Sequence, residues 1–307
     1  MIKGRGLKIG VIGAGVMGKN HLRICASLPG VNLIGLADVN EVAGKQIAEQ
    51  HGIAYFKQYA DLFPLVDAIV LAAPTQAHFE IGKECLNAGK HLLIEKPIAA
   101  SSAEGEQLVA LAAEKKLIFA VGLIERFNPA FQELQKLLRH EKLIGLTLQR
   151  FSPFPERISD ADVIQDMMIH DLDLLLALLP KDEIESIKAE GKKVKSKRLD
   201  QVDVTIFFKS GILAKVHANR VFAIKTRKIM ALTESCLIEA DLLEKRVYVR
   251  DLKGALPSAH HVKPVDQLTV ELTDFIKAVK AQEAPTVDGL AGLKATKLAE
   301  EVSQLCY

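Results

Sequence analysis

A glycine-rich segment near the start of the chain has the residues needed to bind phosphate groups. Gly13, Gly15 and Gly18 form a GxGxxG pattern between an apolar run and an amphipathic stretch. In a strand, turn and helix, the first glycine permits the tight turn, the second lets the backbone approach a pyrophosphate, and the third allows close packing. The N–H groups at the helix start then face the phosphates. This segment, which includes Val16 and Met17, is predicted to bind a dinucleotide.

An acidic residue follows at the spacing typical of a ribose ligand. Asp38 comes after Gly18 at the end of the apolar run LIGLAD, and a carboxylate there accepts hydrogen bonds from the adenosine ribose. No arginine adjoins Asp38, and its charge would repel a 2′-phosphate. The pattern therefore predicts NAD, with NADP less favoured, over a plain turn followed by a surface aspartate.

A Glu-Lys-Pro tripeptide follows a later apolar run. Glu95, Lys96 and Pro97 come after HLLI, at the strand edge where doubly wound sheets bind ligands. A lysine there can donate to a substrate hydroxyl oxygen or to the nicotinamide ribose, and its charge stabilises a developing alkoxide. The alternative is a solvent-exposed Lys96 paired with Glu95.

Asp166 and His170 lie four residues apart in a stretch predicted to be helical over 166–179. Residues at this spacing share a helix face, so Asp166 could orient the imidazole of His170. A neutral imidazole can accept the proton of a reacting hydroxyl. Taken alone, the pair is an ordinary structural helix pair more often than a functional one, and no metal is predicted because further ligands at suitable spacing are missing.

The elements that must position these residues differ between the two halves of the chain. Up to residue 122, continuous apolar runs alternate with amphipathic stretches, which is typical of a parallel sheet covered by helices. Beyond it, alternating segments over 183–250 predict an antiparallel sheet of four to six strands. Further helices are expected at 128–140, 166–179, 266–280 and 289–305.

Composition limits the classes of partner. Lys and Arg number 40 against 38 Asp and Glu, a net charge of +2, so neither nucleic acid nor a membrane surface is expected as a partner. The apolar stretches are too short to span a bilayer, no export signal is evident, and the four cysteines are widely separated. We expect a cytoplasmic protein without a disulfide framework.

Four motifs in order resemble one oxidoreductase family. They are GAGVMG at 13–18, APTQAH at 73–78, AGKHLLIEKP at 88–97 and DxxxHDLD at 166–173, and together they resemble the Gfo/Idh/MocA family. The resemblance implies an α/β fold: an N-terminal Rossmann domain with a doubly wound parallel sheet at 1–122, and a C-terminal α+β domain at 123–307. That second domain is expected to carry a large, open, mostly antiparallel sheet used in a homodimer or homotetramer.

The resemblance also implies roles for individual residues. Lys96, His170 and Asp166 take the catalytic positions of the family, and either Lys96 or His170 could be the base. Other family members often have glycine before the His-Asp element, where this chain has Met167 and Met168. Beside the glycine loop and Asp38, the expected cofactor-binding residues are Pro74, Thr75, His78, Glu95 and Lys96.

Polar residues of the second half are candidates for binding an anionic substrate. Arg157 could contact a diphosphate, and Arg220 with Lys225 and Arg227 could face phosphates. A basic rim or an oligomer interface explains this last group equally well. The full expected substrate set is Glu125, Arg126, Asn128, Arg157 and Arg220.

Two segments narrow the expected activity. Residues 122–130 and 150–176 resemble the branch of the family that contains UDP-N-acetylglucosamine 3-dehydrogenase. This implies NAD-dependent oxidation of a secondary sugar hydroxyl, at C3 of UDP-N-acetylglucosamine or a related nucleotide sugar, with an aminotransferase as a pathway partner. The alternatives are an inositol or free-sugar dehydrogenase and a non-catalytic NAD-binding regulatory protein.

Overall fold

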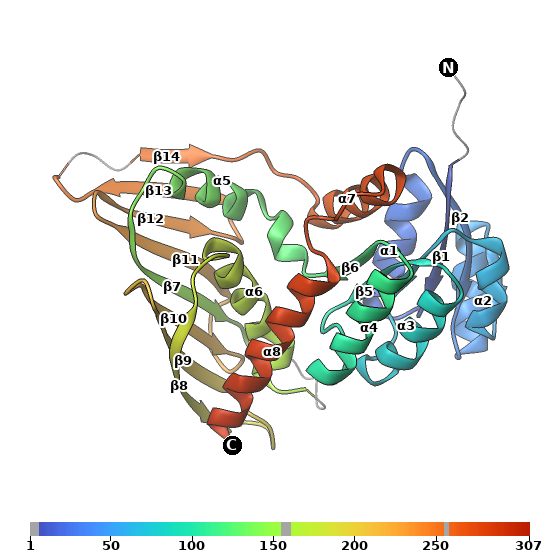
Figure 1. Ribbon diagram of the computed structural model, residues 1–307, viewed down its shortest axis with the longest axis horizontal. Helices are drawn as coiled ribbons and strands as arrows, with labels where there is room; N and C mark the ends of the chain where they lie inside the picture. Colours follow the sequence, from blue (N-terminus) through green and yellow to red (C-terminus); the bar gives the residue numbers. More distant parts are fainter. Residues whose placement is uncertain (1–5, 155–160, 255–257) are drawn as a thin grey trace. The chain divides into compact units, whose positions relative to one another are not determined.

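The computed structural model describes residues 6–154, 161–254 and 258–307. They form two compact units, and Figure 1 labels the main helices and strands of each. The first unit comprises Met1–Ile124 and Asp266–Leu293, and the second comprises Glu125–Val265 and Lys294–Tyr307. None of the helices in the described residues is long and apolar enough to cross a membrane.

The first unit is built on six parallel strands: β1 (Leu7–Ile12), β2 (Val31–Ala37), β3 (Ala54–Phe56), β4 (Ala68–Leu71), β5 (His91–Glu95) and β6 (Phe119–Gly122). Their order in the sheet is β3-β2-β1-β4-β5-β6, the doubly wound order of dinucleotide-binding folds. The residues of β4 and β6 are buried throughout. This burial explains why the strands read as continuous apolar runs rather than alternating ones.

Helices pack around this sheet: α1 (Val16–Ser27), α2 (Glu41–His51), α3 (His78–Asn87), α4 (Ser102–Glu114), α7 (Gln267–Ala281) and the start of α8 (Gly289–Cys306), with the short 3₁₀ helices η1 (Tyr59–Leu65) and η2 (Thr75–Ala77). The sequence predicts that 266–280 belongs to the second domain, and this is corrected. Leu272 and Phe275 of α7 join the core cluster that contains Leu22 and Cys25 of α1. The helical periodicity reveals a buried face but not which partner covers it.

The second unit contains an eight-stranded sheet: β7 (Leu143–Phe151), β8 (Ile184–Lys192), β9 (Gln201–Phe208), β10 (Leu213–Asn219), β11 (Thr226–Thr233), β12 (Cys236–Asp241), β13 (Arg246–Asp251) and β14 (Ser258–His261). The order is β14-β13-β12-β11-β7-β10-β9-β8. Only the β7–β10 pair among these neighbours is parallel. The segment predicted to contain four to six strands contains six, β8 to β13, and the sheet is larger because β7 and β14 from outside this segment join it.

Two helices of the second unit lie on one face of its sheet (Figure 1). Helix α5 (Pro129–Leu138) contacts β12 and β13, and α6 (Ile169–Leu178) contacts β7 and β10. A 3₁₀ turn, η3 (Ile124–Phe127), precedes α5, and a π-helix, η4 (Ile164–Met168), precedes α6. Along β9, buried residues alternate with partly exposed ones, as expected when one face of a sheet is more covered than the other.

Candidate active site

The strands of the first unit end in register, which brings the predicted cofactor residues to one edge of the sheet. Ile12 pairs with Ala37 of β2 and with Leu71 of β4, and Leu71 pairs with Ile94 of β5. The glycine loop, Asp38 and the loop at 72–75 follow directly after these paired residues, and Lys96 follows Ile94 after one residue, Glu95. Ligands of doubly wound sheets bind at this carboxyl edge.

The three glycines of the loop meet different constraints. Gly13 has a φ of +97°, and a Cβ atom there would lie 2.6 Å from the Ala72 carbonyl oxygen. A Cβ atom at Gly18 would lie 1.9 Å from the Gly13 carbonyl oxygen, whereas one at Gly15 would meet no protein atom within 4 Å. Gly13 and Gly18 are therefore required by the fold itself, and Gly15 leaves room for a ligand beside the backbone.

The start of α1 suits an anion. Gly15 caps the helix without a side-chain hydrogen bond, and the first turn contains no acidic residue. The Asp38 carboxylate accepts hydrogen bonds from the Ala14 N–H at 2.6 Å and the Asn40 N–H at 2.7 Å, which fixes the loop against the end of β2. Free N–H groups at a helix start and a half-buried carboxylate beside them fit a pyrophosphate and a ribose.

Glu95 and Lys96 occupy different environments at the end of β5. Glu95 is buried, and its Oε1 atom lies 2.8 Å from the Nε2 atom of His21. Its Oε2 atom accepts a hydrogen bond from the Lys96 N–H at 3.3 Å, and Lys96 is half-buried. The sequence predicts Glu95 as a cofactor ligand, but its carboxylate is directed at His21, a residue that no motif singled out.

In the second unit, Asp166 and His170 do not lie on one regular α-helix. Asp166 belongs to the π-helix η4, and His170 lies in the first turn of α6. The sequence predicts one α-helix over 166–179 and bases the pairing of the two residues on that geometry; a π-helix forms i→i+5 bonds instead. The Asp162 carboxylate accepts hydrogen bonds from the N–H groups of Ile164 and Gln165 and so stabilises the start of this segment.

A buried ion-pair network includes Glu125, which interacts electrostatically with His170. Arg150 donates two hydrogen bonds of 2.8 Å to the Asp171 carboxylate and one of 2.9 Å to Glu125. Arg227 also donates to Glu125 at 2.9 Å. Burial alone would raise the pKa of Glu125, but the charges of Arg150 and Arg227, with a smaller contribution from His170, hold it well below its usual range. An ionised Glu125 would stabilise the charge that His170 gains when it accepts a proton.

Family comparisons match both units of the chain. The model described as "Oxidoreductase family, NAD-binding Rossmann fold" matches residues 7–123, and the GFO/IDH/MocA C-terminal domain matches residues 149–235. The chain belongs to the GFO/IDH/MocA oxidoreductase family. The predicted enzyme class, fold class and NAD cofactor are thereby confirmed.

Individual relatives cover nearly the whole chain. The UDP-N-acetylglucosamine 3-dehydrogenase of Acidithiobacillus ferrooxidans is 29% identical over 96% of both chains, and its solved structure superposes with a TM-score of 0.93 over 98% of both. The myo-inositol 2-dehydrogenase of Thermotoga maritima is 27% identical over 95% of this chain and 94% of its own. A solved oxidoreductase of Agrobacterium radiobacter in complex with NAD⁺ shares the fold, with a TM-score of 0.89 at 17% identity over 97% of this chain and 96% of that one.

His78, a predicted cofactor ligand, has structural partners instead. His78 is buried, and its Nδ1 and Nε2 atoms lie 2.8 Å and 2.9 Å from the carbonyl oxygens of Pro97 and Ala73. Burial lowers the pKa of His78 despite these carbonyls, and a neutral ring can donate to only one of them. His78 therefore connects two loops of the cofactor edge rather than presenting its ring to a ligand, while Pro74 is exposed and Thr75 half-buried.

The expected substrate set is also corrected in part. Arg220 has no exposed surface and donates to Asp200 at 2.9 Å, because it lies inside the second unit just after β10. Glu125 accepts hydrogen bonds from Arg150 and Arg227. Arg126 forms two 2.7 Å hydrogen bonds with Asp173, and Asn128 caps α5. Arg157 lies outside the described residues.

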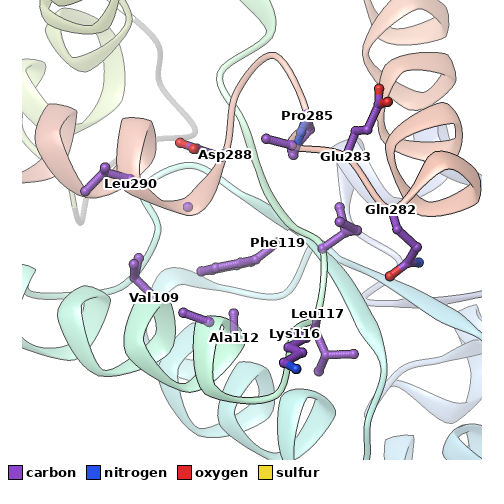
Figure 2. A pocket seen from close by; sticks show the side chains of 14 residues that line it. Val109, Ala112, Lys116, Leu117, Phe119, Gln282, Glu283, Pro285, Asp288 and Leu290 are labelled. Atoms are coloured by element: carbon purple, nitrogen blue, oxygen red, sulfur yellow. The ribbon is translucent and has the colours of Figure 1, made fainter.

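A cavity in the first unit lies away from the cofactor edge. It has a volume of about 420 Å³ and is lined by residues around the end of α4 and the turn between α7 and α8, with Phe119 at the start of β6 (Figure 2). The start of a parallel strand lies at the opposite edge from the one that carries Lys96. This cavity therefore lies away from the predicted cofactor residues.

Proposed function

We propose that this chain is an NAD-dependent dehydrogenase that oxidises the C3 hydroxyl of UDP-N-acetylglucosamine, or of a related nucleotide sugar, to a ketone. The observation that supports this substrate most directly is the similarity to the UDP-N-acetylglucosamine 3-dehydrogenase of A. ferrooxidans, which extends over 96% of both chains. The two folds agree with a TM-score of 0.93. The relative's substrate is therefore the first to test.

Different residues of the chain would have different roles in such a reaction. Lys96 would bind the reacting hydroxyl oxygen and stabilise negative charge on it. His170 would accept the hydroxyl proton, supported by Glu125, and Asp166 would orient His170. Lys96 is the alternative base. Bound NAD supplies the acceptor for the hydride that leaves the same carbon.

Positive charge on the second unit is consistent with an anionic substrate. The side chain of Arg227 keeps 35% of its surface exposed although it contacts Glu125, and Lys225 nearby is exposed. Because Arg220 is buried, these two residues are better candidates for a diphosphate than Arg220 is. Assembly as a homodimer or homotetramer and a pathway aminotransferase remain predictions.

The deciding assay mixes purified protein, NAD and UDP-N-acetylglucosamine and follows the absorbance of NADH. We expect NADH to form with this sugar faster than with myo-inositol or a free hexose. The inositol alternative has its own support, since the myo-inositol 2-dehydrogenase of T. maritima is 27% identical. Turnover of inositol without turnover of the nucleotide sugar would overturn the substrate proposal.

Substitutions of Lys96 and His170 test whether the chain is an enzyme or a non-catalytic NAD-binding protein. Lys96→Met and His170→Ala should each lower kcat by about 10²- to 10⁴-fold, the contribution of a positioned acid or base. NAD affinity should stay near the wild-type value in His170→Ala. Lys45→Met, which alters an exposed lysine paired with Glu41, is the matched control and should leave kcat unchanged. Full activity in both active-site variants would contradict the assigned roles.

A further inference from the structure

Three ionisable side chains from three different elements are buried together in the first unit. His21 of α1 has no exposed surface, Glu95 of β5 is 8% exposed and Glu271 of α7 is 3% exposed. The His21 Nε2 atom lies 2.8 Å from the Glu95 Oε1 atom, and Glu271 interacts electrostatically with Glu95. Acidic residues are rarely buried without partners, so the cluster requires an explanation.

Glu271 is the member of this cluster whose burial is least favourable for the stability of the fold. Among the described residues, neither of its carboxylate oxygens has a hydrogen-bond partner, and the Nδ1 atom of His21 has none either. Burial, followed by the charges of Glu95 and Asp274, raises the pKa of Glu271 well above its usual range. Burial of Glu271 therefore favours its neutral form over the carboxylate. A leucine at this position of α7 would stabilise the core more, so stability does not explain the acid.

Glu95 connects the buried cluster to the cofactor edge. Its Oε1 atom faces His21, and its Oε2 atom accepts the hydrogen bond from the Lys96 N–H at 3.3 Å. On the neighbouring strand, a Cβ atom added to Gly122 would lie 3.1 Å from the same Oε2 atom. The carboxylate is thus fixed on both sides, and a displacement of Glu95 would displace the backbone of Lys96.

We propose that His21 is a positioning residue that holds the Glu95 carboxylate, and through it Lys96, in the geometry needed for reaction. The proposal rests on the role given to Lys96 in the proposed function. The cluster does not resemble a metal centre: no group of three or more His, Cys, Asp or Glu residues in the described part of the chain could hold a metal ion. Instead, Glu95 links the His21 ring to the backbone N–H of Lys96 through its two carboxylate oxygens.

The first experiment replaces His21 by leucine and by glutamine. Leucine fills similar space without a hydrogen-bond donor, whereas the glutamine amide can replace the Nε2–H group that faces Glu95. We expect His21→Leu to lower kcat about 10- to 100-fold, because a small misplacement of a reacting group has effects of this size. The KM for NAD should change little, and His21→Gln should restore most of the rate. Equal rates in all three proteins would overturn the proposal for His21.

The second experiment replaces Glu271 by glutamine, which keeps the shape of the side chain but cannot ionise. Glu271 has no hydrogen bond to Glu95 among the described residues, so kcat in Glu271→Gln should stay near the wild-type value while it falls in His21→Leu. Lys277→Gln changes an exposed residue of the same helix and should also keep the wild-type kcat. A loss in Glu271→Gln equal to the loss in His21→Leu would contradict positioning through the contact between His21 and Glu95.

A measurement without turnover separates this proposal from the proposed function. In protein labelled with ¹⁵N-lysine, the Lys96 side-chain signal is identified as the one missing from Lys96→Met. We expect His21→Leu to shift this signal and its titration, and His21→Gln to return it. A signal that stays in place in His21→Leu contradicts the positioning proposal, whichever sugar is a substrate. Wild-type turnover by Lys96→Met would instead contradict the proposed function.

Discussion

The two units treat buried charge in opposite ways. In the second unit, Arg150 neutralises Glu125 and Asp171 through three hydrogen bonds of 2.8 to 2.9 Å. In the first unit, Glu271 lies beside Glu95 without an arginine or any described hydrogen-bond partner. Paired buried charges hold each other in a fixed geometry, whereas a buried acid without hydrogen-bond partners lowers stability.

The planar guanidinium explains why arginine is used in the second unit. It offers several donors in a fixed fork that matches a carboxylate, and it stays charged when buried. Burial opposes the charge of Arg150, but Asp171 and Glu125 outweigh it and raise the pKa of Arg150. Burial raises the pKa of Asp171 in spite of Arg150, so Arg150 and Glu125 are the members of the network that are held in their charged forms.

The largest expected effect follows from removing Arg150. Arg150→Met leaves two buried carboxylates without their main partner and should lower the free energy of unfolding by about 3–5 kcal/mol. Arg150→Lys, which keeps the positive charge but not the forked guanidinium group, should lower the free energy of unfolding by less. The measurement is denaturant unfolding. Lys209→Met, which breaks an exposed ion pair with Glu183, should leave stability unchanged, and an equal loss there would remove the contrast between buried and exposed pairs.

The second prediction distinguishes a glycine that the fold needs from a glycine that NAD binding needs, both in the glycine loop. Gly18→Ala would force a Cβ atom to 1.9 Å from the Gly13 carbonyl oxygen and should cost about 1–3 kcal/mol of stability, as overpacking does. Gly15→Ala meets no protein atom within 4 Å, so stability should hold while NAD affinity falls. Thermal unfolding and calorimetric NAD binding test the pair. Unaltered NAD affinity in Gly15→Ala would contradict a pyrophosphate beside Gly15.

The third effect is a pH dependence of stability. The raised pKa of Glu271 means that the unfolded chain loses this proton at lower pH than the folded chain. Stability is therefore full below the ordinary carboxyl pKa and is lost as pH rises toward the folded value. Glu271→Gln should escape this loss, so its advantage in free energy of unfolding should grow from pH 4 to pH 7.

A matched variant tests whether burial causes this pH dependence. Glu283 is exposed in the turn after α7, and Glu283→Gln should keep the wild-type dependence of stability on pH. A Glu271→Gln curve that runs parallel to the wild-type curve would show that Glu271 is ionised in the folded protein.

The smallest effect is expected at the cavity of the first unit. Lys116 lines this cavity (Figure 2) and is exposed, and it lies at the edge of the sheet opposite to Lys96. Lys116→Ala should change neither kcat nor NAD affinity in the NADH assay. A clear loss of activity would show that the chemistry of the first unit is not confined to its carboxyl edge.

Local patterns were sufficient for the cofactor region. Gly13, Gly15, Gly18 and Asp38 act through a single turn and the strands on either side of it, so their spacing alone predicts their positions. Lys96 is predicted for the same reason, as the residue that follows a buried strand. His21 escaped prediction because its partner Glu95 lies 74 residues away, and no spacing rule joins two such positions.

The sequence by itself determined the parallel sheet, the glycine loop and the family, because these depend on short-range periodicity and on motifs with fixed spacing. The tertiary structure alone decided that α7 returns to the first unit, that Arg220 and His78 are structural, and that an ionised Glu125 lies near His170. Periodicity indicates that one face of an element is buried, but the packing of segments far apart in the sequence determines which group a buried side chain contacts.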